Sequence, residues 1–567
     1  MNRAFSHFLR GIKFRASGFT FPVQNFGTNG KTPIIPGTWT GLRIPPVRQF
    51  TKTSLVLNKV DRGKNVDIGK RLYQDLLPWD NDGNKATQEF LQRVFLILMD
   101  FINQTNDRNS KVVDFHQPDD LLKLINLNLP NDPKTLDQVL NDFSASLNYV
   151  VKAGHPNYYT ELACGLDTIA MAGEWLIATS NCNMFTYEVS PVFIIMEDIV
   201  LRKMREIIGY PDGNGDSIFA PDTLLANLYA VLAARFTKFP ASKAQGVRKT
   251  GTQLCMFTSE HSQTTLKSCA MITGLGTNNC IMVPTDDRGK MIPSELEKLI
   301  RNSQVKGMDP FFVNCTAGTT MYGAFDPINE IADVCERYNL WLHVNASWGG
   351  ATLLSKKYRH PRMTGIERAH SITWSPHYMM ATTRQCSTIH FRMPDLLNRC
   401  NSLSAQYLFQ RDKFYDIQYD TGDKVIQCGR HNDVFKLWLQ WRAKGTSGLG
   451  KHVDHQMEMN QYLLERMRSM PEKFHLVVPY PEYVNACFWY VPKRLQSMRH
   501  GKERETLLGE VSSVIKRRMM NKGSLMLNCA RKGNNAYFFE AVISNPGVEK
   551  ADLDFLIEEL DRLGKDL

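Results

Sequence analysis

Polar side chains that could do chemistry follow several short apolar segments of this chain. His343 and Asn345 belong to one such segment, and His377 and Tyr378 follow the next. These segments have the length and composition of buried strands, and they alternate with amphipathic helical patterns over about residues 166–440. This alternation predicts an α/β domain with a mainly parallel sheet, whose ligands bind at the carboxyl ends of the strands.

The sequence gives no indication of a metal site, a secretory signal or a membrane span. The twelve cysteines include no C-x-x-C pair and no cysteine–histidine ladder at zinc spacing, so we expect reduced structural thiols and no metal site. The first residues lack the continuous apolar region of a secretory signal. No apolar run approaches the roughly 18 residues that span a bilayer, so we expect a soluble protein.

The net charge of +11 is concentrated near the N-terminus. Residues 1–60 hold nine Lys or Arg and no Asp or Glu, which leaves 68 − 9 = 59 basic against 57 acidic residues in the remainder. Residues 17–60 are rich in Pro and Gly and show no periodicity, so we predict a basic extended arm over 1–65. The nearly neutral body gives no indication of a nucleic-acid interface.

The body divides into three predicted parts. Helical spacing predicts a helical N-terminal domain over 66–165, and the alternating pattern places the large domain at 166–440. From 441 to 567 a long helical stretch leads into strands and a final helix, which predicts a small α+β domain.

Several segments share their residues with a known protein family. They are Asn183–Glu188, Thr316–Pro327, Trp341–Gly350, Thr373–Met380, Tyr419–Lys424 and Val542–Pro546. Together they resemble the pyridoxal-phosphate (PLP) dependent group II amino acid decarboxylases, and among them the glutamate decarboxylases, over about residues 70–567. The resemblance implies the PLP-dependent aspartate aminotransferase-like fold (fold type I), PLP as the family's cofactor, and a two-fold dimer.

The resemblance also implies cofactor-binding residues that this chain lacks. The family's lysine, which forms a Schiff base with PLP, is replaced by Tyr378 beside the retained His377, and a phenol cannot form an imine. Asn345 stands where the family has the aspartate that keeps the pyridine nitrogen protonated. Gln263 stands where the family has a ring-stacking histidine. His261 lies two residues earlier and, if the segment starts a helix, is expected to point elsewhere.

The phosphate and substrate positions depart from the family as well. Where the family has a phosphate cradle ahead of a helix, this chain has Asp222, Thr223 and Leu224, and Asp222 brings negative charge and can cap the helix itself. Glu540 replaces an arginine that binds a substrate carboxylate, so we expect it to repel a dicarboxylic amino acid. Tyr322 matches a tyrosine that protonates the intermediate in the family, and we expect it to serve packing here.

These departures favour a catalytically inactive pseudoenzyme of the carboxy-lyase lineage that binds no cofactor and acts as a structural or scaffold protein. The segment Pro36–Pro45 resembles arm motifs of proteins inside ciliary and sperm-tail microtubules. Trp39, Arg43 and Arg48 would then help residues 1–60 to bind tubulin or another acidic assembly. The expected location is cytoplasmic, at the cytoskeleton of a cilium or flagellum.

Two alternatives stay open. One is a PLP-dependent amino acid decarboxylase with an atypical active site, which uses PLP non-covalently on a substrate other than glutamate. The other concerns the arm, because its Arg-rich, acid-free start resembles a mitochondrial transit peptide. A homodimer is expected in either case, since residues 183–190 and 407–410 resemble the family's interface segments.

Overall fold

The computed structural model describes residues 81–567 except 162–163, 406–408, 410–412 and 532–535. These described residues all belong to one compact unit, Ile68–Leu567. The predicted arm over 1–65, with Trp39, Arg43 and Arg48, lies outside the described residues. Within the described part, no helix has both the length and the apolar character needed to cross a membrane.

The first described segments are helical, as the sequence predicts. They are α2 (Asn81–Asn106), α3 (Pro118–Leu124) and α4 (Leu136–Leu147). α4 begins with a capping box, in which the Thr135 side chain accepts from the Gln138 N–H and the Gln138 side chain accepts from the Thr135 N–H. The short β1 (Tyr158–Tyr159) then pairs in parallel with a strand of the C-terminal sheet, which ties the N-terminal helices to the far end of the chain.

Seven strands form the large sheet, in the order β2-β8-β7-β6-β5-β3-β4. Their bounds are β2 (Asp216–Ala220), β3 (Gln253–Ser259), β4 (Cys280–Val283), β5 (Met308–Thr316), β6 (Trp341–Ala346), β7 (Ser371–Trp374) and β8 (Ser387–Phe391). β3 to β7 pair in parallel, whereas β8 runs antiparallel to both β2 and β7. The predicted mainly parallel sheet is therefore confirmed.

Helices cover both faces of this sheet because alternate strand residues point to opposite sides. Along β3, Leu254 and Met256 join the core beneath α7 (Thr223–Lys238) and α9 (Thr265–Ile272). Cys255 and Phe257 join the core on the other face, which includes residues of α10 (Pro293–Val305) and α11 (Ile328–Arg337). Two short helices, α8 (Ser242–Gln245) and α12 (Leu396–Asn401), complete this part of the chain.

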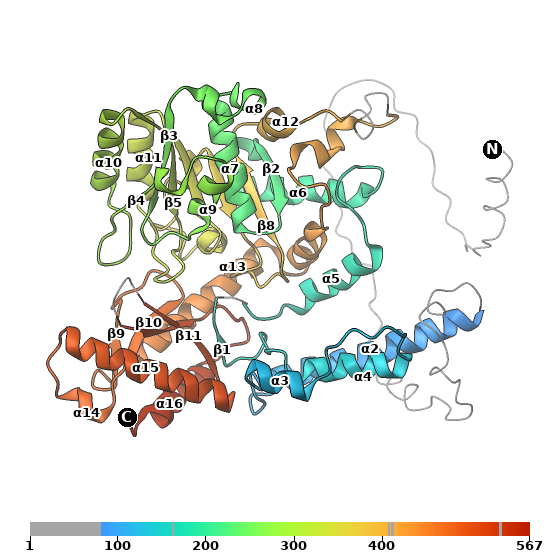
Figure 1. The fold of residues 1–567 in the computed structure, drawn as a ribbon, viewed down its shortest axis with the longest axis vertical. Coiled ribbons are helices and arrows are strands. Elements are labelled where there is room, and N and C mark those ends of the chain that lie inside the picture. Colours follow the sequence, from blue (N-terminus) through green and yellow to red (C-terminus); the bar gives the residue numbers. More distant parts are fainter. Residues whose placement is uncertain (1–80, 162–163, 406–408, 410–412, 532–535) are drawn as a thin grey trace, which may run out of the picture. The chain divides into compact units, whose positions relative to one another are not determined.

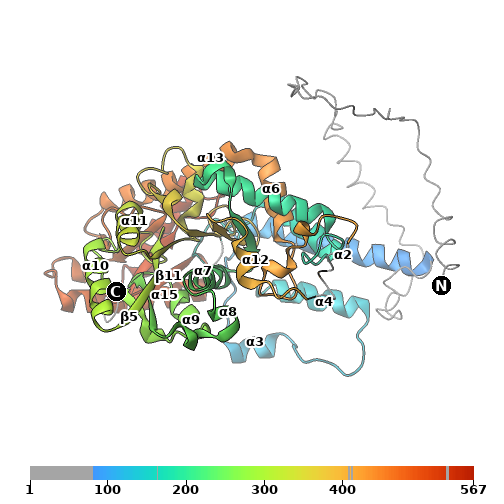
Figure 2. The ribbon, with the colours of Figure 1, turned by 90° about the horizontal axis from the view of Figure 1, so that it is seen from above.

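A long helix follows the part of the chain that carries the seven-stranded sheet. α13 (Asp433–Arg468) contacts α5 (Thr168–Ser180) and α6 (Pro191–Ile208), and Figure 2 shows α6 and α13 lying side by side. α13 bends at Gly445, whose φ of 64° lies in the left-handed region that glycine adopts without strain.

The predicted small domain is built on a five-stranded sheet in the order β1-β11-β12-β10-β9, whose four C-terminal strands are orange to red in Figure 1. Its strands are β9 (Phe474–Leu476), β10 (Asn485–Tyr490), β11 (Met526–Ala530) and β12 (Phe538–Val542), and its helices are α14 (Lys493–Gln496), α15 (Lys502–Lys522) and α16 (Lys550–Gly564). The four C-terminal strands pair antiparallel, with α15 packed against β10, β11 and β12.

Candidate active site

A pocket of about 590 Å³ opens at the carboxyl edge of the large sheet. The segments that follow β2, β3, β5 and β7 form most of its wall. Its lining residues are Glu161, Asp222, Thr223, Leu224, Glu260, His261, Ser262, Gln263, Thr264, Thr265, Thr320, Met321, His377, Tyr378 and Arg384. The predicted residues Asp222, Thr223, Leu224, Gln263, His377 and Tyr378 are thus brought together, at the sheet edge where an α/β fold binds its ligands.

Asp222 closes the N-terminal end of α7. Its Oδ1 accepts a hydrogen bond from the main-chain N–H of Leu225 at 2.9 Å, which satisfies one of the free donors of the first turn. The carboxylate also complements the positive end of the helix dipole. The helix N-terminus that could have bound a phosphate is therefore already bonded to an anionic group of the chain.

Tyr378 lies in the turn that follows β7. Its ring meets the Trp348 ring edge-on, with centroids 5.4 Å apart, and the Arg384 guanidinium lies 5.1 Å from the ring centroid. Burial raises the pKa of the phenol, while the Thr223 hydroxyl is among the groups that lower it. The phenol is therefore neutral at physiological pH, and it extends from β7 toward the start of α7.

His377 lines the pocket, and Asn345 is not among its lining residues. The Cys386 N–H donates to His377 Nδ1 at 3.1 Å, and burial lowers the pKa of His377 to about 4, so its ring is neutral. Asn345 is buried, and its Oδ1 accepts from the main-chain N–H of Ser347 at 3.1 Å and from the Ser347 hydroxyl at 2.7 Å. The Asn345 amide therefore stabilises the turn after β6 by hydrogen bonds.

The expectation that His261 points away from the site is wrong. Residues 260–264 form a turn and not a helix start, since the Ser262 N–H donates to the Ser259 carbonyl and α9 begins only at Thr265. His261 consequently lines the pocket, with its ring centroid 4.9 Å from that of Tyr322. Tyr322 is buried, and burial raises its pKa to about 12.

The expected repulsion by Glu540 is also absent. Glu540 is not one of the lining residues, and only 4% of it is exposed. It accepts a hydrogen bond from Asn485 Nδ2 at 3.0 Å, and burial raises its pKa well above the usual range. A neutral carboxyl group does not repel a dicarboxylic ligand.

Besides Glu260, which accepts a hydrogen bond from the Thr285 hydroxyl at 2.9 Å, two charged lining residues were missed from the sequence, Arg384 and Glu161. The Arg384 guanidinium forms no ion pair with any described residue, and it opposes the effect of burial on Glu161, whose pKa is nevertheless raised to about 7. Both lie outside the motifs on which the resemblance depends. Hydrophobic periodicity could not identify these two residues either, because each lies in an irregular segment.

Unpaired acceptors complete the pocket. Gln263 Oε1 and Thr320 Oγ1 are buried and have no hydrogen-bond partner among the described residues. A ligand that donates hydrogen bonds to them would remove the cost of burying unpaired polar atoms. The pocket therefore suits a small polar ligand that carries both a donor and an anionic group.

The lining residues do not fit a covalently held PLP. No lysine is among them, and Tyr378 cannot supply the amine that such a bond requires. Asp222 adds negative charge where the cofactor's phosphate would meet α7, and neutral Asn345 provides no counter-charge for a pyridinium.

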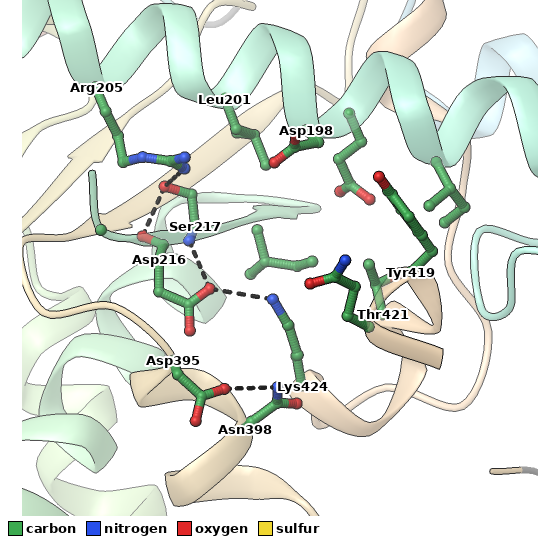
Figure 3. Close-up of a pocket in the computed structure, with 15 residues that line it drawn as sticks. Asp198, Leu201, Arg205, Asp216, Ser217, Asp395, Asn398, Tyr419, Thr421 and Lys424 are labelled. Carbon is green, nitrogen blue, oxygen red and sulfur yellow. Dashed lines mark hydrogen bonds and ion pairs between the residues drawn. The ribbon is translucent and has the colours of Figure 1, made fainter. Parts of the chain in front are cut away.

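A second cavity, of about 420 Å³, lies beside α6 (Figure 3). Its polar side chains are bonded largely to one another. Arg205 donates to the Ser217 hydroxyl at 2.9 Å, and Lys424 lies 3.4 Å from Asp216. The cavity shares no lining residue with the pocket at the sheet edge, so we assign the candidate active site to that pocket alone.

Comparisons with known proteins agree on one family. The model of the pyridoxal-dependent decarboxylase conserved domain matches residues 118–491. The chain is 54% identical to glutamate decarboxylase of Drosophila melanogaster over 499 residues, which cover 88% of this chain and 97% of that protein. The crystal structure of mouse CSAD superposes with a TM-score of 0.82 at 41% identity, covering 85% of this chain and 99% of that one. At 24% identity, tryptophan decarboxylase of Catharanthus roseus shares the fold, with a TM-score of 0.74.

These relatives contradict the interpretation of the chain as an inactive scaffold on ciliary or sperm-tail microtubules. The relative that matches 88% of the chain is named for an enzyme, and the matched family is one of decarboxylases. No relative found supports a cytoskeletal role or location. The prediction that the chain is not an enzyme was therefore wrong, and the alternative of an atypical decarboxylase agrees better with the relatives.

The prediction that the chain binds no cofactor disagrees with its match to the pyridoxal-dependent decarboxylases, a family that depends on pyridoxal phosphate. The match to that family spans the whole large domain and the start of the small one, and the fold agrees with the solved relatives over 85% of the chain. This chain belongs to the pyridoxal-dependent decarboxylase family.

Proposed function

We propose that this chain is an amino acid carboxy-lyase of the pyridoxal-dependent class, with an atypical active site in the pocket at the carboxyl edge of the large sheet. The identity with glutamate decarboxylase over 88% of the chain supports this reaction class. The observation that carries the proposal is the set of groups in the pocket. The Arg384 guanidinium has no ion-pair partner among the described residues, and it complements the carboxylate of an amino acid. The buried, unpaired oxygens of Gln263 and Thr320 complement the ammonium group.

Arg384 is the carboxylate-binding group in this proposal. A guanidinium can donate two parallel hydrogen bonds to one carboxylate, which fixes the orientation of the ligand as well as binding it. The position of Arg384 over the Tyr378 ring, 5.1 Å from its centroid, orients the guanidinium by a cation–π contact. A ligand carboxylate would therefore lie beside Tyr378.

Gln263 and Thr320 are placed to bind the ammonium group. Each has a buried oxygen without a partner among the described residues, and leaving such an atom unpaired costs about 1–3 kcal/mol. Glu161 adds a carboxylate that is ionised above its pKa of about 7. An amino acid would thus find both a cation and hydrogen-bond acceptors among the residues that line the pocket.

Pyridoxal phosphate, when bound, supplies an electron-withdrawing ring that stabilises the charge left behind by departing carbon dioxide. In this proposal the cofactor is held reversibly, because Tyr378 offers no amine. Asp222, which caps α7, would weaken the binding of a phosphate at that helix end by charge repulsion. We expect slow turnover, since loss of reaction-specific groups costs several orders of magnitude in rate.

Release of carbon dioxide from carboxyl-labelled amino acids tests this function. The purified full chain is incubated with added PLP and, in separate reactions, with L-glutamate, L-aspartate, L-cysteine sulfinate and L-tryptophan. We expect release faster than with PLP alone for at least one amino acid. Release at the background rate for all four would overturn the proposal.

We also propose that the chain forms a homodimer. Apolar side chains lie exposed on α6 at Val192, Ile195 and Ile199, which recur on one helix face. The neighbouring α5 exposes Trp175 and Leu176. A second copy that covers these side chains would bury apolar surface of the kind found in obligate dimers.

A further inference from the structure

A cleft of about 470 Å³ lies on the small domain, away from any residue of the proposed active site. We call it the C-terminal basic cleft. It is lined by Arg468, Pro471, Glu472, Phe474, His475, Leu476, Pro479, Gln496, His500 and Arg504. These residues come from the end of α13, from β9 and the segments around it, from α14, and from the start of α15. The proposed decarboxylase activity assigns no role to any of them.

Arg504 is the central charge of the cleft. Only 6% of it is exposed, and its Nε donates to the Leu495 carbonyl at 3.2 Å. One terminal nitrogen faces His500 Nδ1 at 3.2 Å. Among the residues that the structure describes, none offers Arg504 a carboxylate at ion-pair distance. A buried cation without a counter-ion is costly, so the site would gain from an anion.

Two histidines lie beside the arginines of the cleft. The ring centroids of His475 and His500 are 5.2 Å apart, and His475 also stacks on Trp489. Burial lowers the pKa of His475, and His500 and Arg504 lower it further, whereas Glu505 opposes them. His475 is therefore neutral at physiological pH, and negative charge in the cleft would raise its pKa.

Arg468 adds a second guanidinium from α13. It donates to the Pro479 carbonyl at 2.6 Å and lies over the Tyr480 ring, 4.9 Å from the centroid. Glu472 is the one carboxylate among the ten lining residues. Two arginines thus share the cleft with a single acidic group, which leaves the cleft with an excess of positive charge.

We propose that the C-terminal basic cleft binds the phosphate group of a small phosphate monoester. Guanidinium groups match the oxygen geometry of phosphate and bind it bidentately. The volume exceeds that of a bare ion and falls in the range of small-molecule sites. Phe474, Leu476 and Pro479 supply an apolar wall for the organic part of the ligand.

Calorimetric titration of the full chain with inorganic phosphate and with phenyl phosphate tests this proposal. We expect one saturable site per chain, with phenyl phosphate the tighter ligand. Arg504→Gln should weaken binding by about tenfold or more, because it removes charge-assisted hydrogen bonds. Arg468→Gln changes an exposed side chain, should leave the fold intact, and should weaken binding several-fold.

Arg499→Gln is the matched control, because Arg499 is exposed on the same segment and does not line the cleft. It should leave the dissociation constant unchanged within about twofold. Binding should also tighten as the pH falls from 7.5 to 5.5, since a bound anion favours protonated His475. Absence of saturable binding, or equal affinities for Arg468→Gln, Arg504→Gln and Arg499→Gln, would overturn the proposal.

Discussion

At the scale of single residues, Tyr378 decides how the chain can hold its cofactor. The phenol provides no amine, so we expect no covalent bond between PLP and the wild-type pocket. Tyr378→Lys should gain such a bond, and Tyr378→Phe should not. Peptide mapping after incubation with PLP and reduction with borohydride measures this difference at residue 378. Failure of the lysine variant to be labelled would show that the cofactor does not reach this position.

Arg384 is the residue whose loss should most affect ligand affinity. Its hydrogen bonds to a carboxylate are charge-assisted and worth about 1.5–3 kcal/mol, so Arg384→Gln should raise the dissociation constant about 10- to 100-fold. Titration with L-glutamate and L-cysteine sulfinate measures the change. Arg288→Gln, at an exposed arginine, is the control. Equal affinities in both variants would remove Arg384 from the proposed site.

Glu161 should make stability depend on pH near neutrality. Its pKa is raised to about 7 in the folded chain, so the folded state binds the proton more tightly than the unfolded state. The contribution of Glu161 to stability is therefore complete below about pH 4.5 and is lost as the pH rises through about 7.

Glu161→Gln should remove this loss of stability at high pH, because glutamine does not titrate. We expect the variant to match the wild type at about pH 4 and to exceed it by about 1–3 kcal/mol at pH 8. Denaturant unfolding at the two pH values gives the free energies of unfolding. A constant difference between the two proteins across this range would show that Glu161 does not titrate there.

At the scale of elements, the contact between α5 and α13 depends on Gly173, which has no side chain. A Cβ at Gly173 would lie 2.7 Å from the Cα of Lys436, so Gly173→Ala must push the two helices apart. Overpacking of this kind costs about 1–3 kcal/mol. Gly429→Ala is the control, because nothing lies within 4 Å of its added Cβ. Thermal unfolding should separate the two variants, and equal midpoints would show that the helices accommodate the methyl group.

Strands and helices with a clear period were predictable from the sequence. β7 (Ser371–Trp374) is the apolar segment that precedes His377 and Tyr378, and α7 begins at Thr223 with Asp222 as its cap, as the sequence predicts. β4 could not be predicted in this way, since its four apolar residues carry no periodic signal. The turn that brings His261 into the pocket was also missed, because main-chain hydrogen bonds set it and not side-chain spacing.

The site could be predicted only where a motif marked it. Asp222, Gln263 and Tyr378 were found by their motifs and do line the pocket. Arg384 and Glu161 belong to no motif, and only the packing of the chain places them there. We predicted an inactive chain because cofactor-binding residues of the family are replaced. That prediction was wrong for a similar reason, because local motifs do not show what the whole pocket can still bind.

At the scale of the whole molecule, the exposed face of α6 predicts the homodimer. A charge at Ile195 would face apolar surface in a dimer, so Ile195→Asp should yield monomers. Ile272→Asp, at a residue of α9 that is also exposed, should stay dimeric as the control. Sedimentation equilibrium distinguishes the two. A wild-type chain that sediments as a folded monomer at micromolar concentration would contradict the proposal.

The most direct test of the account is carbon dioxide release before and after removal of the cofactor. Wild-type protein is assayed with PLP and the best of the four amino acids, passed through gel filtration, and assayed again with and without fresh PLP. Because Tyr378 provides no covalent attachment, the account predicts that release is lost on filtration and returns in full when PLP is added. Release that survives filtration, or no release above the background of PLP alone, would contradict it.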